Sequence, residues 1–159
     1  MTILGFTPFT WFHTLLSLVM LFAGFVVVKD LFRSHVDKVW LAVFLVSGVL
    51  TNVTGFGFPF SQLNESHYTA IFSLIVLAAA ILAFYVFKLA GAWRWVFALS
   101  VVLAFYTDAL VAIAQLFKKV PALGAPTASS EPPFLAAQLA LLAIIIWLCV
   151  KAYKQFRPG

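Results

Sequence analysis

Residues 74–84 read LIVLAAAILAF, an uninterrupted run of apolar side chains. A membrane strand would alternate apolar and polar residues, whereas this stretch is apolar at every position and is typical of a buried or lipid-facing helix. The run extends in both directions to about twenty residues, which is the length that crosses the hydrocarbon core of a bilayer. Inside lipid each backbone donor and acceptor needs a partner within the segment, and this requirement also predicts a helix.

Four further stretches have the same character. We expect five transmembrane helices, over residues 8–32, 39–56, 67–89, 93–117 and 134–153. Of the 159 residues 64% are hydrophobic and only 9% are charged, and the mean hydropathy is +1.09. A water-soluble fold of this length could not hide so much apolar surface. The sequence therefore predicts an all-α, polytopic membrane helix bundle, with residues 1–159 forming one integral membrane domain in contact with the lipid bilayer.

The basic residues are divided unevenly between the two predicted sides of the membrane. Only Lys118 and Lys119 fall on the side of the first residue. The other eight lie at the opposite side: Lys29, Arg33, Lys38, Lys88, Arg94, Lys151, Lys154 and Arg157. The positive-inside rule then predicts an outside N-terminus and a cytoplasmic C-terminus, which five spans satisfy. Because these residues mark the ends of apolar segments rather than forming a patch, the formal charge of +5 does not indicate nucleic-acid binding.

One face of the first predicted helix is small and polar. His13, Ser17 and Gly24 share this face, because they lie four and eleven residues apart. Small and polar side chains in membrane helices usually contact other helices, so we expect this face to point into the bundle. It carries one of the three ionisable side chains that we place in the outer half of the membrane.

The other two ionisable side chains are His67 and Asp108. Two histidines on two helices are the arrangement that holds a b-type haem, or a metal ion together with a carboxylate. They equally suit ordinary roles, in which His13 bonds to a neighbouring helix and His67 is an interfacial residue. The identity of any metal is left open by the sequence.

Asp108 is expensive to bury alone, because an unpaired charge in the membrane costs several kcal/mol. We therefore expect a polar partner from the first, second or third helix, with Thr51, Asn52 and His13 as candidates. Gln115 follows on the same helix face, seven residues later. A buried carboxylate of this kind can also relay protons or bind a cation or an amine.

The second predicted helix ends in an aromatic and glycine-rich stretch, TGFGFPF, at residues 54–60. Pro59 lacks an amide hydrogen and disfavours helical geometry at the residue before it, so the helix should stop here. Phe56, Phe58 and Phe60 then have two interpretations. They anchor the helix end at the outer interface, or they form a rim or gate over a site beneath, packing on the first and third helices with His13 below.

Three strings, SGVLTNVTGFGFPF at residues 47–60, LAGAWRW at 89–95 and EPPF at 131–134, resemble a family of small proteobacterial polytopic inner-membrane proteins. The resemblance covers nearly the whole chain. The family has no assigned activity, so the resemblance implies a multi-pass protein of the bacterial inner (cytoplasmic) membrane and implies no particular chemistry.

These patterns favour a non-enzymatic protein that binds a cofactor or a small amphipathic ligand near its periplasmic face, with b-type haem as the most specific version. No serine has the context of a nucleophile elbow, so a catalytic triad is not indicated. Two alternatives stay open. One is an accessory or assembly subunit of a larger membrane complex, or a homo-oligomer, and the other is a small transporter that uses Asp108.

Overall fold

The computed structural model describes residues 7–58, 61–63, 65–119 and 132–157, and this part of the chain is helical without any strand. The helices are α1 (Pro8–Leu31), α2 (Lys38–Gly55), α3 (Glu65–Ile81), its continuation η1 (Leu82–Val86), α4 (Trp93–Lys119) and α5 (Pro132–Gln155). Five candidate spans within them are long and apolar enough to cross a membrane. The predicted all-α, five-span membrane fold is therefore confirmed.

The first two helices begin at local signals in the sequence. Pro8 occupies the first turn of α1, where its missing amide hydrogen costs nothing, and the side chain of Thr7 caps the helix by accepting from the Thr10 amide at 3.2 Å. The carboxylate of Asp37 caps α2, accepting from the amides of Val39 and Trp40 at 2.9 and 3.1 Å. These caps set where each helix enters the bundle.

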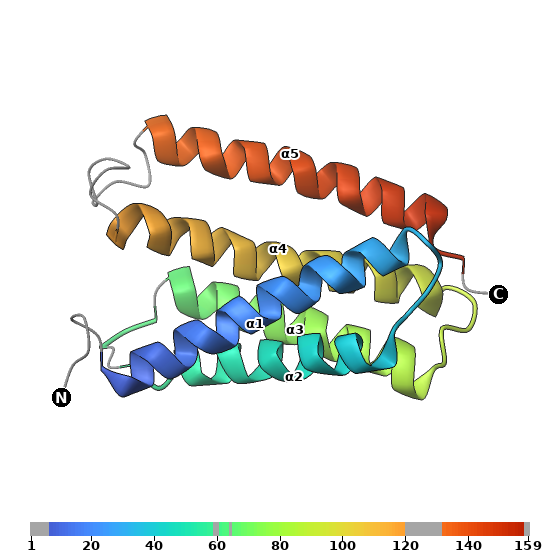
Figure 1. The fold of residues 1–159 in the computed structure, drawn as a ribbon, viewed down its shortest axis with the longest axis horizontal. Helices are drawn as coiled ribbons and strands as arrows, with labels where there is room; N and C mark the ends of the chain where they lie inside the picture. The colour runs from blue at the N-terminus through green and yellow to red at the C-terminus, as the bar shows by residue number, and fades with distance from the viewer. Residues whose placement is uncertain (1–6, 59–60, 64, 120–131, 158–159) are drawn as a thin grey trace.

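Helices α1 to α4 form a closed four-helix arrangement, in which α1 and α3 each pack against both α2 and α4. Successive helices run in opposite directions, as the colour gradient in Figure 1 shows, so the connections fall alternately at the two ends. The beginning of α1 and the end of α5 consequently lie at opposite ends of the bundle (Figure 1).

Helix α5 lies outside this arrangement and packs mainly along α4 (Figure 1). In the most apolar stretch of α4, 50% of the residues are buried inside the protein, whereas in that of α5 only 11% are. The difference arises because α4 has neighbours on several sides, whereas α5 has a single extended contact. Helix α4 is thus the central helix of the protein, and α5 is a peripheral one.

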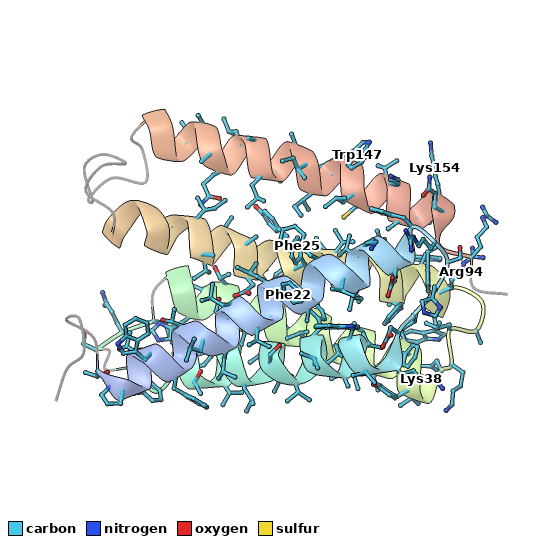
Figure 2. The ribbon with its side chains drawn as sticks, in the orientation of Figure 1. Phe22, Phe25, Lys38, Arg94, Trp147 and Lys154 are labelled. Carbon is cyan, nitrogen blue, oxygen red and sulfur yellow. The ribbon has the colours of Figure 1, made fainter. Side chains whose placement is uncertain are left out.

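Apolar side chains on the outer faces are widely exposed, as expected for contact with lipid. Phe22 and Phe25 lie halfway along α1 (Figure 2) and are 62% and 66% exposed. The inner face of the same helix is different: Gly24, which lies between Phe22 and Phe25 in the sequence, is buried. A β-carbon at Gly24 would overlap the ring of Phe105 on α4. Glycine is therefore what allows α1 and α4 to approach this closely.

The basic residues that the sequence places on one side gather at one end of the structure. Figure 2 shows Lys38, Arg94 and Lys154 there, on three different helices. We call this the basic end. Ser34, in the α1–α2 connection, ties it to the C-terminal segment: its hydroxyl donates to the Gln155 carbonyl at 2.7 Å and accepts from the Arg157 amide at 2.9 Å. Which side of the membrane the basic end faces stays a prediction.

The third span departs from the expected uniform helix over residues 67–89. The α-helix ends at Ile81, and the following residues form the wider turn η1, closed by the Phe87 amide donating to the Leu82 carbonyl at 2.9 Å. Lys88 and Leu89 then adopt positive φ values of 53° and 61°, which lie outside right-handed helical geometry. The apolar run could not show this change, because its composition is the same on both sides of Ile81.

Candidate functional site

His13 and Ser17 lie one turn apart on α1 and bond to two different helices. The Nδ1 atom of His13 is 2.8 Å from the Thr54 hydroxyl on α2. Ser17 donates from its hydroxyl to Oδ1 of Asp108 on α4, also at 2.8 Å. The polar face of α1 thus points into the bundle, as the sequence predicts.

The hydrogen bonds around Thr54 decide which group is the donor in the His13–Thr54 bond. The Thr54 hydroxyl has one proton, and the Leu50 carbonyl is an acceptor 2.7 Å away within the same helix. The hydroxyl therefore donates to Leu50 and accepts from Nδ1–H of His13. The Nδ1 atom of His13 therefore carries a proton in this arrangement.

Asp108 is a buried carboxylate with incomplete hydrogen bonding. It is 7% exposed, and Ser17 satisfies only one of its two carboxylate oxygens. The other oxygen, Oδ2, is buried without a hydrogen-bond partner among the described residues. The expected polar partner from another helix is confirmed, but it is Ser17 and not Thr51, Asn52 or His13. Ser17 lies on α1, which packs directly against α4, whereas Thr51 and Asn52 lie on α2, opposite α4 in the four-helix arrangement.

Thr51 lies at the same depth as Ser17. Helices α1 and α2 are antiparallel, His13 is level with Thr54, and Met20 lies against Gly48. Ser17 is midway between His13 and Met20, and Thr51 is midway between Thr54 and Gly48. The Thr51 hydroxyl oxygen is buried and, like Oδ2 of Asp108, has no partner among the described residues.

Asn52 extends this group to the third helix. Its side-chain amide donates to the Gly48 carbonyl at 2.7 Å and to the Ser73 hydroxyl on α3 at 3.1 Å. Together these residues form what we call the polar layer, to which each of the four core helices contributes: Ser17, Thr51, Asn52, Ser73 and Asp108. On the side of the basic end the layer is bounded by two fully buried apolar residues, Met20 and Leu77, which both lie against Gly48.

Aromatic rings lie on the other side of the polar layer, at the end remote from the basic residues. The Phe58 ring packs edge-on against His13 and Phe9, with centroid distances of 5.2 and 4.9 Å. The Phe56 ring contacts His67 at 5.2 Å. We call Phe9, Phe56 and Phe58 the aromatic lid. The segment after α2 thus packs on both α1 and α3, with each histidine beside a different phenylalanine.

Two predicted site residues have side chains that lie outside the described part of the structure. Phe60 is outside the described residues, and the side chain of Gln115 is too, although its backbone belongs to α4. His67 is buried within the protein, at 6% exposed, and whether it lies at the membrane interface stays a prediction. Its burial follows from the packing of Phe56 over the beginning of α3.

Two residues of the site were not singled out from the sequence. Ser73, which is 1% exposed, precedes the run LIVLAAAILAF, and a serine inside an apolar span is a signal for a contact between helices. Phe9 gave no signal, because it is one of 18 phenylalanines and only its contact with Phe58 distinguishes it.

The described part of the chain contains no group of three or more His, Cys, Asp or Glu side chains placed to hold a metal ion. No protein family, curated protein or solved structure shows significant similarity to the chain. The fold and the site therefore define the class by themselves: a multi-pass helical membrane protein with a buried polar layer under an aromatic lid.

Proposed function

We propose that this protein is a non-enzymatic membrane protein that binds a small amphipathic ligand at the polar layer. The observation that carries the proposal is the buried Oδ2 atom of Asp108, which has no partner among the described residues. Leaving a carboxylate oxygen unsatisfied in a low-dielectric interior costs free energy, so such a group is retained where a ligand or a proton satisfies it.

The surroundings of Asp108 support binding of a molecule with a polar head and an apolar body. The polar layer offers acceptors at one depth, and the aromatic lid offers apolar surface immediately beyond it. Because ligand sites in helix bundles are built from side chains on facing helices, contributions from α1 to α4 suit such a site. We place the protein in a bacterial inner membrane with the basic end in the cytoplasm, so that the lid faces the periplasm.

A second candidate function is that of an accessory subunit in a larger membrane complex. It is favoured by α5, whose exposed apolar side chains include Leu139, Ile144 and Ile146 at 57%, 53% and 56%. They point in several directions around the helix, so α5 offers surface to another membrane protein as well as to lipid. Co-purification of one partner in fixed proportion, lost when α5 is altered, would support this function instead.

A ligand screen on the purified full-length protein tests the first proposal. Thermal unfolding in a non-ionic detergent is followed with a library of small amphipathic compounds for wild type, Asp108→Asn and Thr107→Val. Thr107 is the matched control, because it is buried beside Asp108 but its hydroxyl is satisfied by the Ala104 carbonyl of its own helix at 2.8 Å. Saturation at about 100 times Kd stabilises a protein by about 2.7 kcal/mol.

We expect at least one compound to raise the Tm of wild type and of Thr107→Val, and to leave Asp108→Asn unchanged. If no compound distinguishes wild type from Asp108→Asn, the binding proposal is wrong. Flux of a compound across proteoliposomes that depends on Asp108 would show that the same site serves transport.

A further inference from the structure

The ligand site has a definite charge requirement. Of the carboxylates whose side chains the structure describes, Asp30 and Asp37 lie at the basic end, and Asp108 alone belongs to the polar layer. The described Lys and Arg side chains are also at the basic end, so none of them neutralises Asp108. A buried carboxylate in the membrane is stable when a proton neutralises it or when a cation pairs with it, and a ligand can supply the cation.

The unsatisfied oxygens of the polar layer indicate the kind of cation. Oδ2 of Asp108 and the Thr51 hydroxyl oxygen are both buried and without partners among the described residues, on α4 and α2. Both residues are 7% exposed. Ser17, which bonds to Asp108, is level with Thr51, so the two oxygens lie at a similar depth, on opposite helices of the four-helix arrangement. An ammonium group has three N–H donors, so its donors match two acceptor oxygens with one donor to spare.

A metal ion is a poorer match for the same atoms. Calcium takes six to eight oxygen ligands and magnesium six, usually including several carboxylates or waters. The polar layer provides one carboxylate, and the described residues form no group of three or more metal-binding side chains. Two acceptors and one negative charge correspond to a singly charged hydrogen-bond donor.

The aromatic lid indicates what the cation is attached to. The rings of Phe58, Phe9 and Phe56 lie beyond the layer on the side remote from the basic end, and the Phe58 ring contacts His13 directly. Aromatic faces attract organic cations, and their apolar surface accommodates an alkyl or aryl chain. A ligand that extends from Asp108 toward the lid therefore has a cationic head and an apolar body.

We propose that the ligand head held between Asp108 and Thr51 is an organic ammonium ion carrying an apolar substituent. This inference rests on the proposed ligand-binding function and specifies its chemical class. It makes two residues distinguishable: Asp108 supplies the charge and one acceptor, and Thr51 supplies the second acceptor without charge.

Three probes of different charge test the inference: hexylammonium chloride, 1-hexanol and sodium chloride, at constant pH and ionic strength in a non-ionic detergent. Binding is measured by calorimetry and by the shift in Tm for wild type, Asp108→Asn, Thr51→Val and Thr107→Val. We expect hexylammonium to bind wild type and Thr107→Val equally. We expect Asp108→Asn to abolish binding and Thr51→Val to weaken it about tenfold, which corresponds to about 1.4 kcal/mol.

Other outcomes overturn the inference in separable ways. Asp108-dependent binding of 1-hexanol that equals that of hexylammonium would remove the charge requirement but keep the ligand site. Stabilisation by sodium ions alone would replace the ammonium ion by a metal ion. Hexylammonium binding equally to wild type and Asp108→Asn would refute the inference, and a library screen without an Asp108-dependent compound would refute the proposed function as well. If Asp108→Asn does not fold, equal hexylammonium affinity in Thr51→Val and Thr107→Val refutes the two-acceptor geometry.

Discussion

Ser17 of α1 donates a hydrogen bond to Asp108 of α4 across the bundle, at 2.8 Å. Among the described residues, Ser17 is the hydrogen-bond partner of this buried carboxylate. The two residues are 91 positions apart in sequence. Their bond joins the helix that begins the bundle to the helix at its centre. It occupies Oδ1 of the carboxylate and leaves Oδ2 buried without a partner among the described residues.

Ser17→Ala should destabilise the folded protein by roughly 1–2 kcal/mol, because it leaves both oxygens of a buried carboxylate without a donor. The measurement is chemical or thermal unfolding in detergent. Ser47→Ala is the matched control, since the Ser47 hydroxyl donates to the Val43 carbonyl within its own helix at 2.6 Å. Equal effects of the two substitutions would show that the Ser17–Asp108 bond contributes nothing specific.

Gly24→Ala should cost roughly 1–3 kcal/mol, because the added methyl group overlaps the Phe105 ring and pushes α1 away from α4. Gly55→Ala is the control, since a β-carbon there would meet its nearest heavy atom, His13 Cε1, at an ordinary 3.7 Å. Adding Phe105→Leu to Gly24→Ala should restore part of the lost stability. Failure of that rescue, or tolerance of Gly24→Ala, would argue against the close approach.

Two adjacent isoleucines in α5 report on how this helix packs. Ile145 is 3% exposed and belongs to the core, whereas Ile144 is 53% exposed. Ile145→Ala should lower the free energy of unfolding by about 2 kcal/mol or more, because it leaves a cavity between packed helices. Ile144→Ala should have little effect on the isolated protein. If Ile144 is the more sensitive position, α5 is rotated or is covered by a partner protein.

The orientation of the chain is tested by reporter fusions. The uneven distribution of Lys and Arg predicts that a reporter after Gly159 is cytoplasmic, and that one inserted near Ser129 is periplasmic. Both positions lie outside the described residues, but the helices that lead to them end at opposite ends of the bundle (Figure 1). Finding both reporters on one side of the membrane would contradict the five-span topology.

The haem hypothesis makes a spectroscopic prediction of its own. If His13 and His67 ligate a b-type haem, protein expressed with ample haem shows a Soret band. His13→Ala should then abolish the band, and Phe58→Ala should leave it but make the iron more accessible to external ligands, because Phe58 packs against His13. The absence of Soret absorption from the wild-type protein would refute this hypothesis, and it would not affect the proposed ligand site at Asp108.

The sequence was sufficient for the number of helices, because crossing a bilayer demands about twenty apolar residues and a helical backbone whatever the neighbours are. It was also sufficient for the collection of basic residues at one end, since each lies next to the end of a span. The inward polar face of α1 could be predicted too, because its spacing follows from the geometry of one helix.

Contacts between helices were decided only by the tertiary structure. Thr51, Asn52 and His13 were reasonable partners for Asp108, but the partner is Ser17, on a helix that packs directly against α4. The change to a π-helix after Ile81 and the peripheral place of α5 were likewise invisible in uniformly apolar runs. Hydropathy records the affinity of each segment for lipid, whereas the choice among helix neighbours depends on the shapes and hydrogen bonds of residues far apart in the chain.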